Sequence, residues 1–419
     1  MNYINKNSVD VNDFVEESYL DYGKEVNLRR SLPCIYDGLK PVYRKLIISA
    51  MEYPKGKWVD TVSLIGTCKG KYYLHGDASL EDVTGRLVQS GIFDGYGAFG
   101  KATLTCNLPN AAARYTRVKI SDKYRSIFDK LMSYVPTFNN DLGIPEPEYI
   151  ASPIPLGILL GMFGFGIGLI TRIPPLEPKS VVQAMKADDP QKLVFPGFNV
   201  SAQEKLDFWT KSNFSITYKW KWTRDQEGYH IFGSGDWVKP NYPPMYSKED
   251  TAQEYPKYQL IDNFGDGRTD VTIIPYSKDI DDKAIDKCCT VKQGMLIWVS
   301  DPFTNKVRRV NGRNFLKICY DNYLKLYQTY KIDTLKKLRI RLEAYVHFKD
   351  IANRILNTDN SKEKIYQDLK LSCIDVVDFV SGMPVGTLRN CDPVAKIKSI
   401  KDEIKVVENY DVNSILDTL

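Results

Sequence analysis

The stretch RSLPCIYDGLKPVYRK, residues 30–45, sets the pattern for the first third of the chain. Pro33, Asp37-Gly38 and Pro41 punctuate a loop, and the residues that follow predict a helix over 42–52. On the N-terminal side, VNDFVEESYLDYG, residues 11–23, predicts a short amphipathic helix. Several more short helices and loops are expected up to about residue 134.

Positive charge is concentrated in the same part of the chain. The 419 residues contain 57 Lys and Arg against 52 Asp and Glu, a net charge of only +5. Residues 29–125 hold 16 basic and 8 acidic residues, so this segment carries +8 and the rest about −3. The charge favours a polyanionic partner, although an ordinary solvated surface is the alternative. Basic and aromatic residues mingle here in the helix-then-wing alternation of a compact DNA-binding module.

Cysteine and histidine usage excludes common metal and redox motifs. The eight cysteines include no C-x-x-C pair, and the three histidines stand far apart, so no zinc or thioredoxin-like motif is present. The N-terminal residues MNYINKNSVDVNDF have neither a basic nor an apolar targeting region, so we expect a cytoplasmic protein with free thiols. Without a Walker A sequence, nucleotide hydrolysis on this chain is not expected.

The uncharged run IPLGILLGMFGFGIGLI, residues 154–170, imitates a membrane span. It is too short for a spanning helix, and its five glycines make a stable helix improbable. Glycines at this density suit strands, bulges and close backbone approach.

The middle of the chain predicts β-structure. Residues 214–222 alternate with a period of two and predict one strand, and the turn-like DQEG at 225–228 leads into 229–232 to complete a hairpin. Further strands are expected around 271–274 and 295–299.

Beyond residue 313 the apolar period becomes helical. Steps of three and four over some 40 residues predict a long helix or coiled coil, with a break near Asp333. The pattern returns over 394–407. Packing within the chain and dimerisation both fit this spacing.

Tyr115, in the cluster AAARYTRVKI at 111–120, is a candidate nucleophile because Arg114 and Arg117 stand beside it. A tyrosine hydroxyl has a pKa of about 10, so attack on a phosphodiester needs groups that stabilise the phenolate and the phosphate charge. Arginine's planar guanidinium suits phosphate. The attack would leave a covalent phosphotyrosine. A structural tyrosine is the alternative, because the chain contains 27 tyrosines.

Seven motifs share the order and spacing of one protein family. They are SYLDY (18–22), RSLP (30–33), DGLKPVYRK (37–45), GKYYLHGD (70–77), DGYGAFG (94–100), ARYT (113–116) and IPP (173–175). Over residues 10–180 the chain resembles the DNA-cleaving subunit of type IIA topoisomerases, the group that includes the gyrase A and topoisomerase IV A subunits. The resemblance implies an α+β multidomain fold. Its parts would be an N-terminal helix and winged-helix DNA-cleavage domain (1–160), a β-containing tower domain (161–312), and coiled-coil helices with a C-terminal dimer gate (313–419).

The resemblance also implies roles for single residues. Tyr115 would form the 5′-phosphotyrosine link, and Arg114 would stabilise the transition state. Arg30 and His75 would contact the scissile phosphate or its neighbours. The remaining DNA contacts would be Lys40, Arg44, Lys45, Lys71, Tyr73 and Arg117. Backbone contacts of this kind predict binding that falls steeply with salt.

Some positions depart from the family pattern. Tyr73 replaces the first histidine of the family's H-P-H-G-D. Ala78 stands where quinolone-susceptible members have serine, while Asp82 keeps their acidic residue, so a weak quinolone response is expected. Phe165 falls where the family has an isoleucine that wedges between base pairs; core packing is the alternative for this ring.

The resemblance implies a homodimer that cuts both strands of double-stranded DNA, with one Tyr115 for each strand. The family also needs Mg²⁺, held mainly by an acidic domain, and ATP, hydrolysed by an ATPase. Neither signature occurs in this sequence, so we expect separate partner subunits to supply both, and no membrane partner. The chain is expected to lack the wrapping domain of gyrase A, which favours relaxation and decatenation.

Two other classes remain as alternatives. A tyrosine recombinase or a nicking enzyme would also form a phosphotyrosine. The recombinase would need several Arg and His residues around its tyrosine, and the nicking enzyme would need a close histidine pair. A non-catalytic winged-helix scaffold that bends DNA would share the basic segment without using Tyr115.

Overall fold

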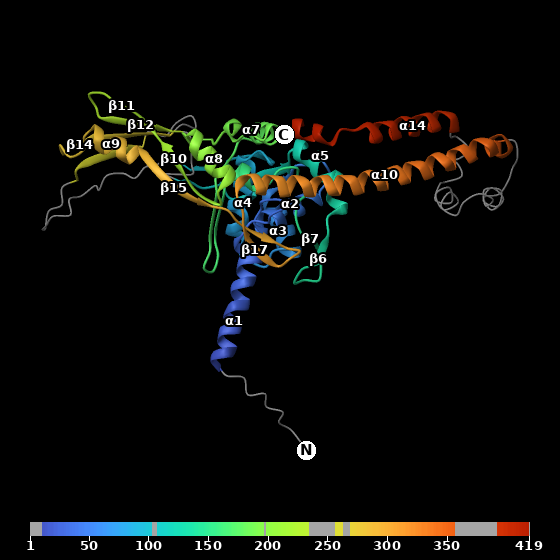
Figure 1. Cartoon of the computed structure of the whole chain (residues 1–419), viewed down its shortest axis with the longest axis horizontal. Coiled ribbons are helices and arrows are strands. Elements are labelled where there is room, and N and C mark those ends of the chain that lie inside the picture. Colours follow the sequence, from blue (N-terminus) through green and yellow to red (C-terminus); the bar gives the residue numbers. More distant parts are fainter. Residues whose placement is uncertain are drawn as a thin grey trace, which may run out of the picture. The chain divides into compact units, whose positions relative to one another are not determined.

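Figure 1 shows the computed structural model of the chain, which describes residues 11–102, 107–196, 198–233, 256–262, 269–356 and 392–418. The chain divides into two compact units. One runs to Tyr323 and includes Leu416–Leu419, and the other is Leu324–Ile415. The described residues mix helices with antiparallel sheets, in agreement with the expected α+β class.

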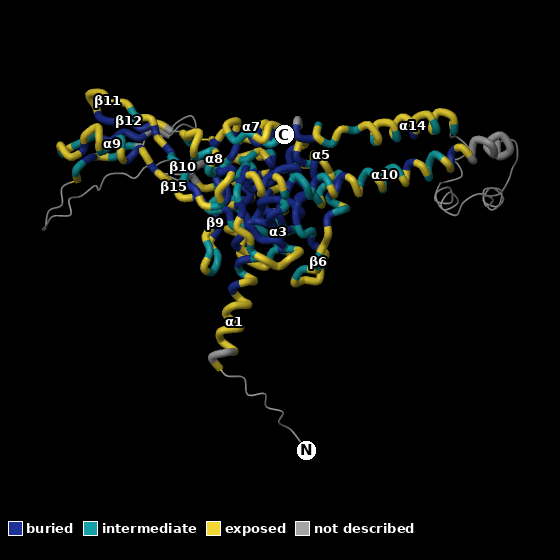
Figure 2. Tube along the Cα trace, viewed as in Figure 1, coloured by how far each residue is buried: buried dark blue, intermediate teal, exposed yellow. Residues whose placement is uncertain are grey.

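Three helices and a small sheet form the core of the N-terminal part. The helices are α2 (Pro41–Met51), α3 (Thr61–Lys71) and α4 (Asp77–Gln89), and the sheet has the order β1 (Val59–Asp60), β5 (Arg117–Ile120), β2 (Phe93–Tyr96). The prediction of a helix over 42–52 is confirmed, and Pro41 suits its first turn because no N–H is needed there. The helices contact one another through side chains that are at most 1% exposed, among them Leu46, Ile47, Leu64, Leu80 and Leu87. Figure 2 shows this part as the most deeply buried.

The predicted N-terminal helix is present as α1 (Val11–Val26), which continues into a short π-helical segment, η1 (Asn27–Ser31). Most of α1 is exposed, as Figure 2 shows, whereas Asn27 and Ser31 of η1 are buried. The segment η1 therefore anchors the chain where α1 ends.

A buried ion pair fixes the loop that leads into α2. The Asp37 carboxylate is 0% exposed and accepts a hydrogen bond from Nε of Arg44 at 2.8 Å. It also accepts bonds from the backbone amides of Leu39, at 2.8 Å, and Ile150, at 2.9 Å. Burial of the charge is tolerated here because both carboxylate oxygens have donors. One side chain thus joins the loop, α2 and the distant residue 150.

The apolar run at 154–170 folds as short pieces. It contains the single-turn α6 (Gly157–Leu160) and the strand β8 (Met162–Phe165), which pairs antiparallel with β9 (Ile170–Ile173). This agrees with the expectation that its glycines suit strands and close approach. No described helix is both long enough and apolar enough to cross a membrane.

Two four-stranded sheets follow. The first has the order β10 (Asn213–Lys219), β15 (Thr290–Leu296), β9, β8, and the second β11 (Lys221–Arg224), β12 (Tyr229–Gly233), β14 (Thr269–Pro275), β13 (Tyr258–Asp262). The predicted hairpin is confirmed as β11 and β12. The single strand predicted over 214–222 is wrong, because the chain changes sheets at Trp220. There the backbone N–H bonds the carbonyl of Cys289 at 2.8 Å, and the ring is 1% exposed.

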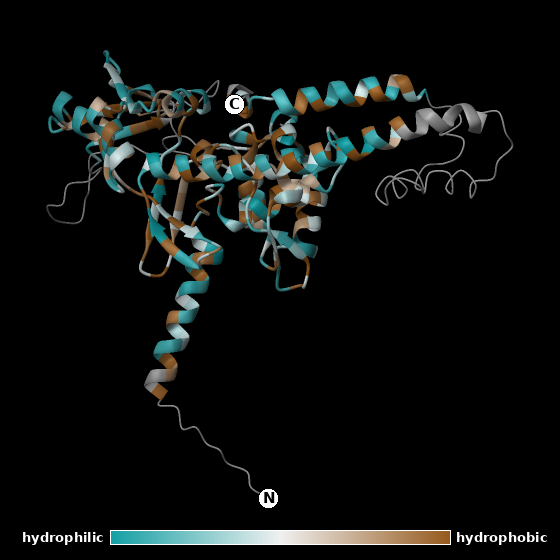
Figure 3. Cartoon of the chain, turned by 45° about the vertical axis from the view of Figure 1, so that its right-hand side comes forward, coloured by the Kyte–Doolittle hydropathy of each residue, from teal (hydrophilic) through white to brown (hydrophobic). Residues whose placement is uncertain are grey.

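Beyond the sheets, α10 (Gly312–Leu356) runs without interruption, so the predicted break near Asp333 is wrong. Asp333 lies inside the helix and pairs with Lys337 one turn later at 2.8 Å, which suits helical spacing. In the second unit α10 lies beside α14 (Pro393–Asn409), as Figures 1 and 3 show. The Lys331 ammonium donates to the carbonyl of Glu408 at 2.7 Å. The ring centres of Tyr327 and Tyr410 lie 5.5 Å apart, and Ile400 of α14 is 1% exposed. Within the described residues the apolar pattern therefore packs against its own chain, and dimerisation stays a prediction.

The remaining elements connect these parts. They are β3 (Lys101–Ala102), β4 (Asn107–Leu108), η2 (Ala113–Tyr115), α5 (Asp122–Leu131), η3 (Met132–Tyr134), β6 (Thr137–Asn139), β7 (Pro145–Pro147), α7 (Pro178–Ala187), η4 (Pro190–Lys192), α8 (Ala202–Thr210), α9 (Asp282–Cys289), β16 (Trp298–Asp301), β17 (Lys306–Arg309) and η5 (Val412–Thr418).

Candidate nucleic-acid interface

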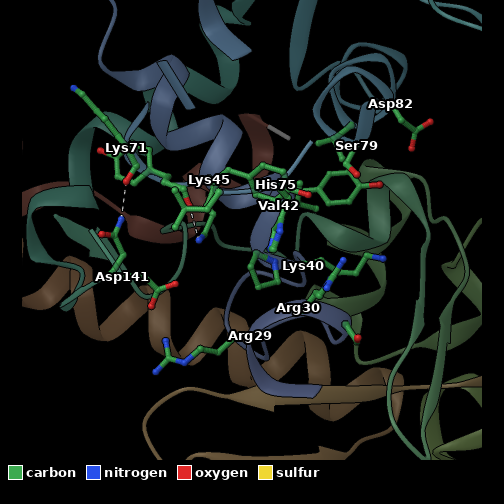
Figure 4. A pocket seen from close by; sticks show the side chains of 18 of the residues that line it. Arg29, Arg30, Lys40, Val42, Lys45, Lys71, His75, Ser79, Asp82 and Asp141 are labelled. Carbon is green, nitrogen blue, oxygen red and sulfur yellow. Dashed lines mark hydrogen bonds between the residues drawn. The ribbon is translucent and has the colours of Figure 1, made fainter. Parts of the chain in front are cut away.

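Most of the residues singled out from the sequence line one pocket of about 590 Å³ in the first unit (Figure 4). η1, α2, the end of α3 with its following loop, α4, the loop between β6 and β7, and β8 all contribute to it. The predicted residues in its lining are Arg30, Lys40, Lys45, Lys71, Tyr73, His75, Asp82 and Phe165. The structure thus brings together residues that are up to 135 positions apart in the sequence.

The pocket lining is strongly basic. Arg29 and Arg30 come from η1, Lys40 and Lys45 from the start of α2, and Lys71 from the end of α3. Arg30 is exposed and makes no ion pair with any described residue. Cations gathered on a concave surface attract a polyanion such as a nucleic-acid backbone.

The lysines of the pocket are held by backbone and acidic groups. Nζ of Lys40 donates to the carbonyl of Phe163 at 2.9 Å, and Nζ of Lys45 donates to that of Tyr72 at 2.6 Å. Burial, together with the nearby Arg86 charge, lowers the pKa of Lys40. Lys71 pairs with Glu52. Each of these ammonium groups therefore already has a partner within the protein.

Arg44 is a correction to the predicted DNA contacts. Its side chain is 6% exposed and bound by Asp37, and it does not line the pocket. Burial disfavours its charge, but Asp37 more than offsets this and the pKa of Arg44 is raised. Arg44 is therefore a structural cation, because a phosphate could reach it only after the buried pair had been broken.

Tyr115 lies on the short turn η2, outside the pocket lining. Its side chain is 67% exposed, and no described residue hydrogen-bonds its hydroxyl group. The Arg114 guanidinium carbon lies 4.6 Å from the centre of the tyrosine ring. The predicted nucleophile is thus presented to solvent with a cation against its π-face.

The turn that carries Tyr115 is fixed immediately after it. The buried hydroxyl of Thr116 donates to the hydroxyl of Thr61 at 2.8 Å, which joins η2 to the first residue of α3. Arg117 pairs with Asp60 at 3.0 Å on the surface. The position of Tyr115 is therefore set by α3 and the sheet β1, β5, β2.

Ala78 and Asp82 lie on the first two turns of α4, and both are exposed. Asp82 faces the pocket and accepts a hydrogen bond from Nε of Arg86 at 3.1 Å. Ala78 does not line the pocket, whereas the next residue, Ser79, does.

Several pocket residues were missed from the sequence, among them Arg29, Ser79, Asp141 and Phe163. Two of these carried a signal. Arg29 forms an Arg-Arg pair with Arg30, and Phe163 alternates with Phe165 at the spacing of a strand. Ser79 and Asp141 carried none, because their neighbours in the pocket are set by tertiary packing.

The residues described do not form a metal site. Within the described ranges, no three His, Cys, Asp or Glu side chains gather in a way that could hold a metal ion. The pocket lining is mainly cationic, which does not fit the carboxylate ligands that Mg²⁺ prefers.

Part of the chain is similar to known proteins. Residues 30–206 match the model of the A subunit of DNA gyrase/topoisomerase IV. Similar proteins include the DNA gyrase A subunit of Buchnera aphidicola subsp. Baizongia pistaciae, 33% identical over 190 residues, which are 43% of this chain and 22% of that protein. The DNA topoisomerase 4 A subunit of Synechocystis is 31% identical over 189 residues, covering 42% and 20%. The DNA gyrase A subunit of Clostridium acetobutylicum is 30% identical over 200 residues, covering 44% and 24%.

The matched segment spans less than a quarter of each of these relatives. The segment that matches the family model includes Arg30, Tyr115 and Phe165. It therefore contains residues of the basic pocket as well as the turn η2 that carries Tyr115.

Proposed function

Residues 30–206 are related to the A subunits of type IIA topoisomerases, and from this premise we propose that the chain cleaves and rejoins DNA in an ATP-dependent topoisomerase. The Tyr115 oxygen would attack a backbone phosphorus. An O–P bond forms to the tyrosine, the bond from phosphorus to the 3′ oxygen breaks, and the phenol proton leaves while the 3′ oxygen gains one. The product is a 5′-phosphotyrosine and a free 3′-hydroxyl, and the reverse attack reseals the strand.

One observation carries this proposal. The structure presents an exposed tyrosine with arginine on its ring, and the same matched segment holds a basic pocket whose Arg30 is unpaired in the described part of the chain. In phosphoryl transfer the protein contributes mainly positioning and charge stabilisation, and this combination supplies both.

The proposed roles follow from position. Arg114 stabilises charge at the attacked phosphate, with Arg30 and His75 at that phosphate or its neighbours. Lys40, Lys45, Lys71 and Tyr73 hold the backbone in the pocket, and Arg117 contacts it near Tyr115 once its exposed pair with Asp60 opens. Phe165, which is 64% exposed, enters the duplex as a wedge.

The wider assembly is also proposed. α2, α3 and α4 with the sheet β1, β5, β2 would form the winged-helix module, and the two larger sheets the tower. The helices α10 and α14 would belong to a coiled coil with a dimer gate. Separate subunits would provide ATP hydrolysis and hold Mg²⁺, which supplies charge stabilisation at the phosphate. We also propose that the chain acts as the medium subunit of a topoisomerase of the T-even phage kind, with relaxation and decatenation of phage DNA as its task.

Tyr115 is absent from the pocket lining, so we propose that the pocket of one copy acts with Tyr115 of a second copy in a homodimer. Tyr115→Phe and Arg30→Ala should each suppress cleavage alone. When the two variants are co-expressed, mixed dimers hold one intact site and should produce single-strand nicks, measured as open-circular plasmid after detergent and protease. Co-expression of Tyr115→Phe with the wild-type chain sets the expected nick level. No recovery of nicking would show that pocket and tyrosine act within one copy.

A detergent-trapping experiment tests the function as a whole. The full chain is incubated with supercoiled plasmid, Mg²⁺ and candidate ATPase and metal-binding subunits, and then stopped with detergent. We expect protein attached to 5′ DNA ends and linear plasmid after protease treatment. DNA that is bound and bent without any covalent attachment would support the non-catalytic scaffold instead.

Ala78→Ser tests the drug-response expectation. A serine hydroxyl at the start of α4 adds a polar group beside the retained Asp82 carboxylate, so quinolone-stabilised cleavage should increase. The measurement is the drug concentration that doubles trapped linear DNA. Ser79→Ala serves as the neighbouring control, and equal drug responses in Ala78→Ser and the wild-type chain would contradict the expectation.

A further inference from the structure

The β8–β9 hairpin presents two aromatic rings to the basic pocket. Phe163 and Phe165 alternate with buried residues along β8, and their side chains are 39% and 64% exposed. The ring centres lie 4.5 Å apart at an interplanar angle of 83°. Both rings line the same pocket as the cations of η1 and α2. An exposed aromatic pair beside phosphate-binding cations is a surface suited to nucleic-acid bases.

Phe163 is held from two directions. On β9 the Arg172 guanidinium carbon lies 4.9 Å from the centre of its ring, and the two residues face each other in the strand register. In addition, Nζ of Lys40 bonds the Phe163 carbonyl at 2.9 Å. Phe163 is therefore fixed, and its ring limits the positions open to Phe165.

The tip of the hairpin is fixed to η1 by one side chain. Asn27 is 8% exposed, and its amide oxygen accepts from the backbone N–H of Ile167 at 2.8 Å, while its amide nitrogen donates to the Ile167 carbonyl at 3.1 Å. Gly164 and Gly166 allow this approach, because a Cβ on either would collide with Ser31 or Asn27. The segment η1, which supplies Arg29 and Arg30, thus also fixes how far Phe163 and Phe165 lie from these two arginines.

From these contacts we propose that Phe163 and Asn27 are positioning residues that hold Phe165 ready to enter duplex DNA. The inference rests on the proposed function and extends it. Phe163 supports the ring of Phe165 by direct contact, and Asn27 keeps the hairpin at a fixed distance from the phosphate-binding cations. A wedge that is ordered before binding loses little conformational entropy when it inserts between base pairs.

The test measures DNA bending apart from cleavage. The full chain in a Tyr115→Phe background, which cannot form the covalent link, is bound to a duplex with a fluorescent donor and acceptor at its ends. The bent fraction is read from energy transfer. We expect Phe163→Ala and Asn27→Ala each to lower the equilibrium between bent and straight complexes roughly tenfold, or about 1.4 kcal/mol. Phe163→Tyr, which keeps the ring, should retain bending.

Two controls keep the result specific. Phe165→Ala gives the bent fraction expected when the wedge is lost. Tyr276→Ala removes an aromatic ring that is 61% exposed and lies outside the pocket, and it should leave the bent fraction unchanged. A thermal melt of each variant reports folding. If the Asn27 variant fails to fold, the Phe163 pair of variants decides the result alone.

Bending by Phe163→Ala equal to that of the parent would overturn the proposal, as would a parent complex that leaves the duplex straight. Covalent trapping with the unaltered Tyr115 is scored separately. A chain that cleaves DNA without the Phe163 effect therefore keeps the proposed function and loses only this inference.

Discussion

Tyr115→Phe is expected to abolish covalent attachment to DNA while leaving DNA binding unchanged. The substitution removes only the hydroxyl oxygen that would attack phosphorus. Removal of the nucleophile lowers kcat by about 10⁶-fold in a serine protease, so trapped complexes should fall below detection. Because Tyr115 is 67% exposed and its hydroxyl has no partner among the described residues, the fold should not respond. The phenylalanine ring also keeps its contact with Arg114.

The measurement compares detergent-trapped covalent complex with binding to an uncleaved duplex at the same salt concentration. Tyr276→Phe is the matched control, since that tyrosine is similarly exposed and lies away from the matched segment. Residual trapped complex in Tyr115→Phe at the level of the wild-type chain would assign the nucleophile elsewhere. Equal loss of DNA binding and of cleavage would instead assign Tyr115 to DNA contact.

Asp37→Ala is expected to lower the free energy of unfolding of the first unit by about 3–5 kcal/mol, the cost of leaving a buried charge without its partner. The variant leaves the Arg44 guanidinium buried and removes the acceptor of the Leu39 and Ile150 amides. Urea unfolding, followed by tryptophan fluorescence, measures the change.

The control for Asp37→Ala is Asp321→Ala, which removes an exposed partner of Lys317 one helical turn away and should cost at most about 0.5 kcal/mol. Arg44→Met in the Asp37→Ala background should recover part of the loss, because it removes the unpaired charge. A loss below about 1 kcal/mol for Asp37→Ala would show that the pair contributes no more than a surface salt bridge.

The contrast between Arg44 and Lys45 shows where sequence reasoning reaches its limit. Both are basic residues in one short motif, and the motif predicts a DNA contact for each. Lys45 lines the pocket, whereas Arg44 turns to Asp37, seven positions earlier. Helical position alone does not reveal this, since the direction of Arg44 depends on where the preceding loop places a carboxylate.

The predicted strand at 214–222 failed for a related reason. Its alternation continues through Trp220, but the backbone passes from one sheet to another at that residue. Both sheets bury alternate residues, so a period of two does not mark the boundary between them. By contrast, the helix over 42–52 and the hairpin around 225–228 depend on local signals, and both are confirmed.

The set of residues that line the pocket could be predicted only in part. The motifs that contain Arg30, Lys40 and His75 are recognisable in the sequence, and the structure brings them together. The position of Tyr115 outside this pocket depends on how η2 packs against α3, which no local pattern encodes.

The hydroxyl contact between Thr116 and Thr61 has a consequence for a cut strand. A DNA end linked to Tyr115 would be one residue away from the buried hydrogen bond between Thr116 and Thr61 of α3. The end could therefore move very little relative to α3. Two such ends would then separate only if the modules of α2, α3, α4 and the small sheet moved apart as rigid bodies, each with its own DNA end attached. Rejoining would be accurate because, when the modules return, each end comes back to the place it left.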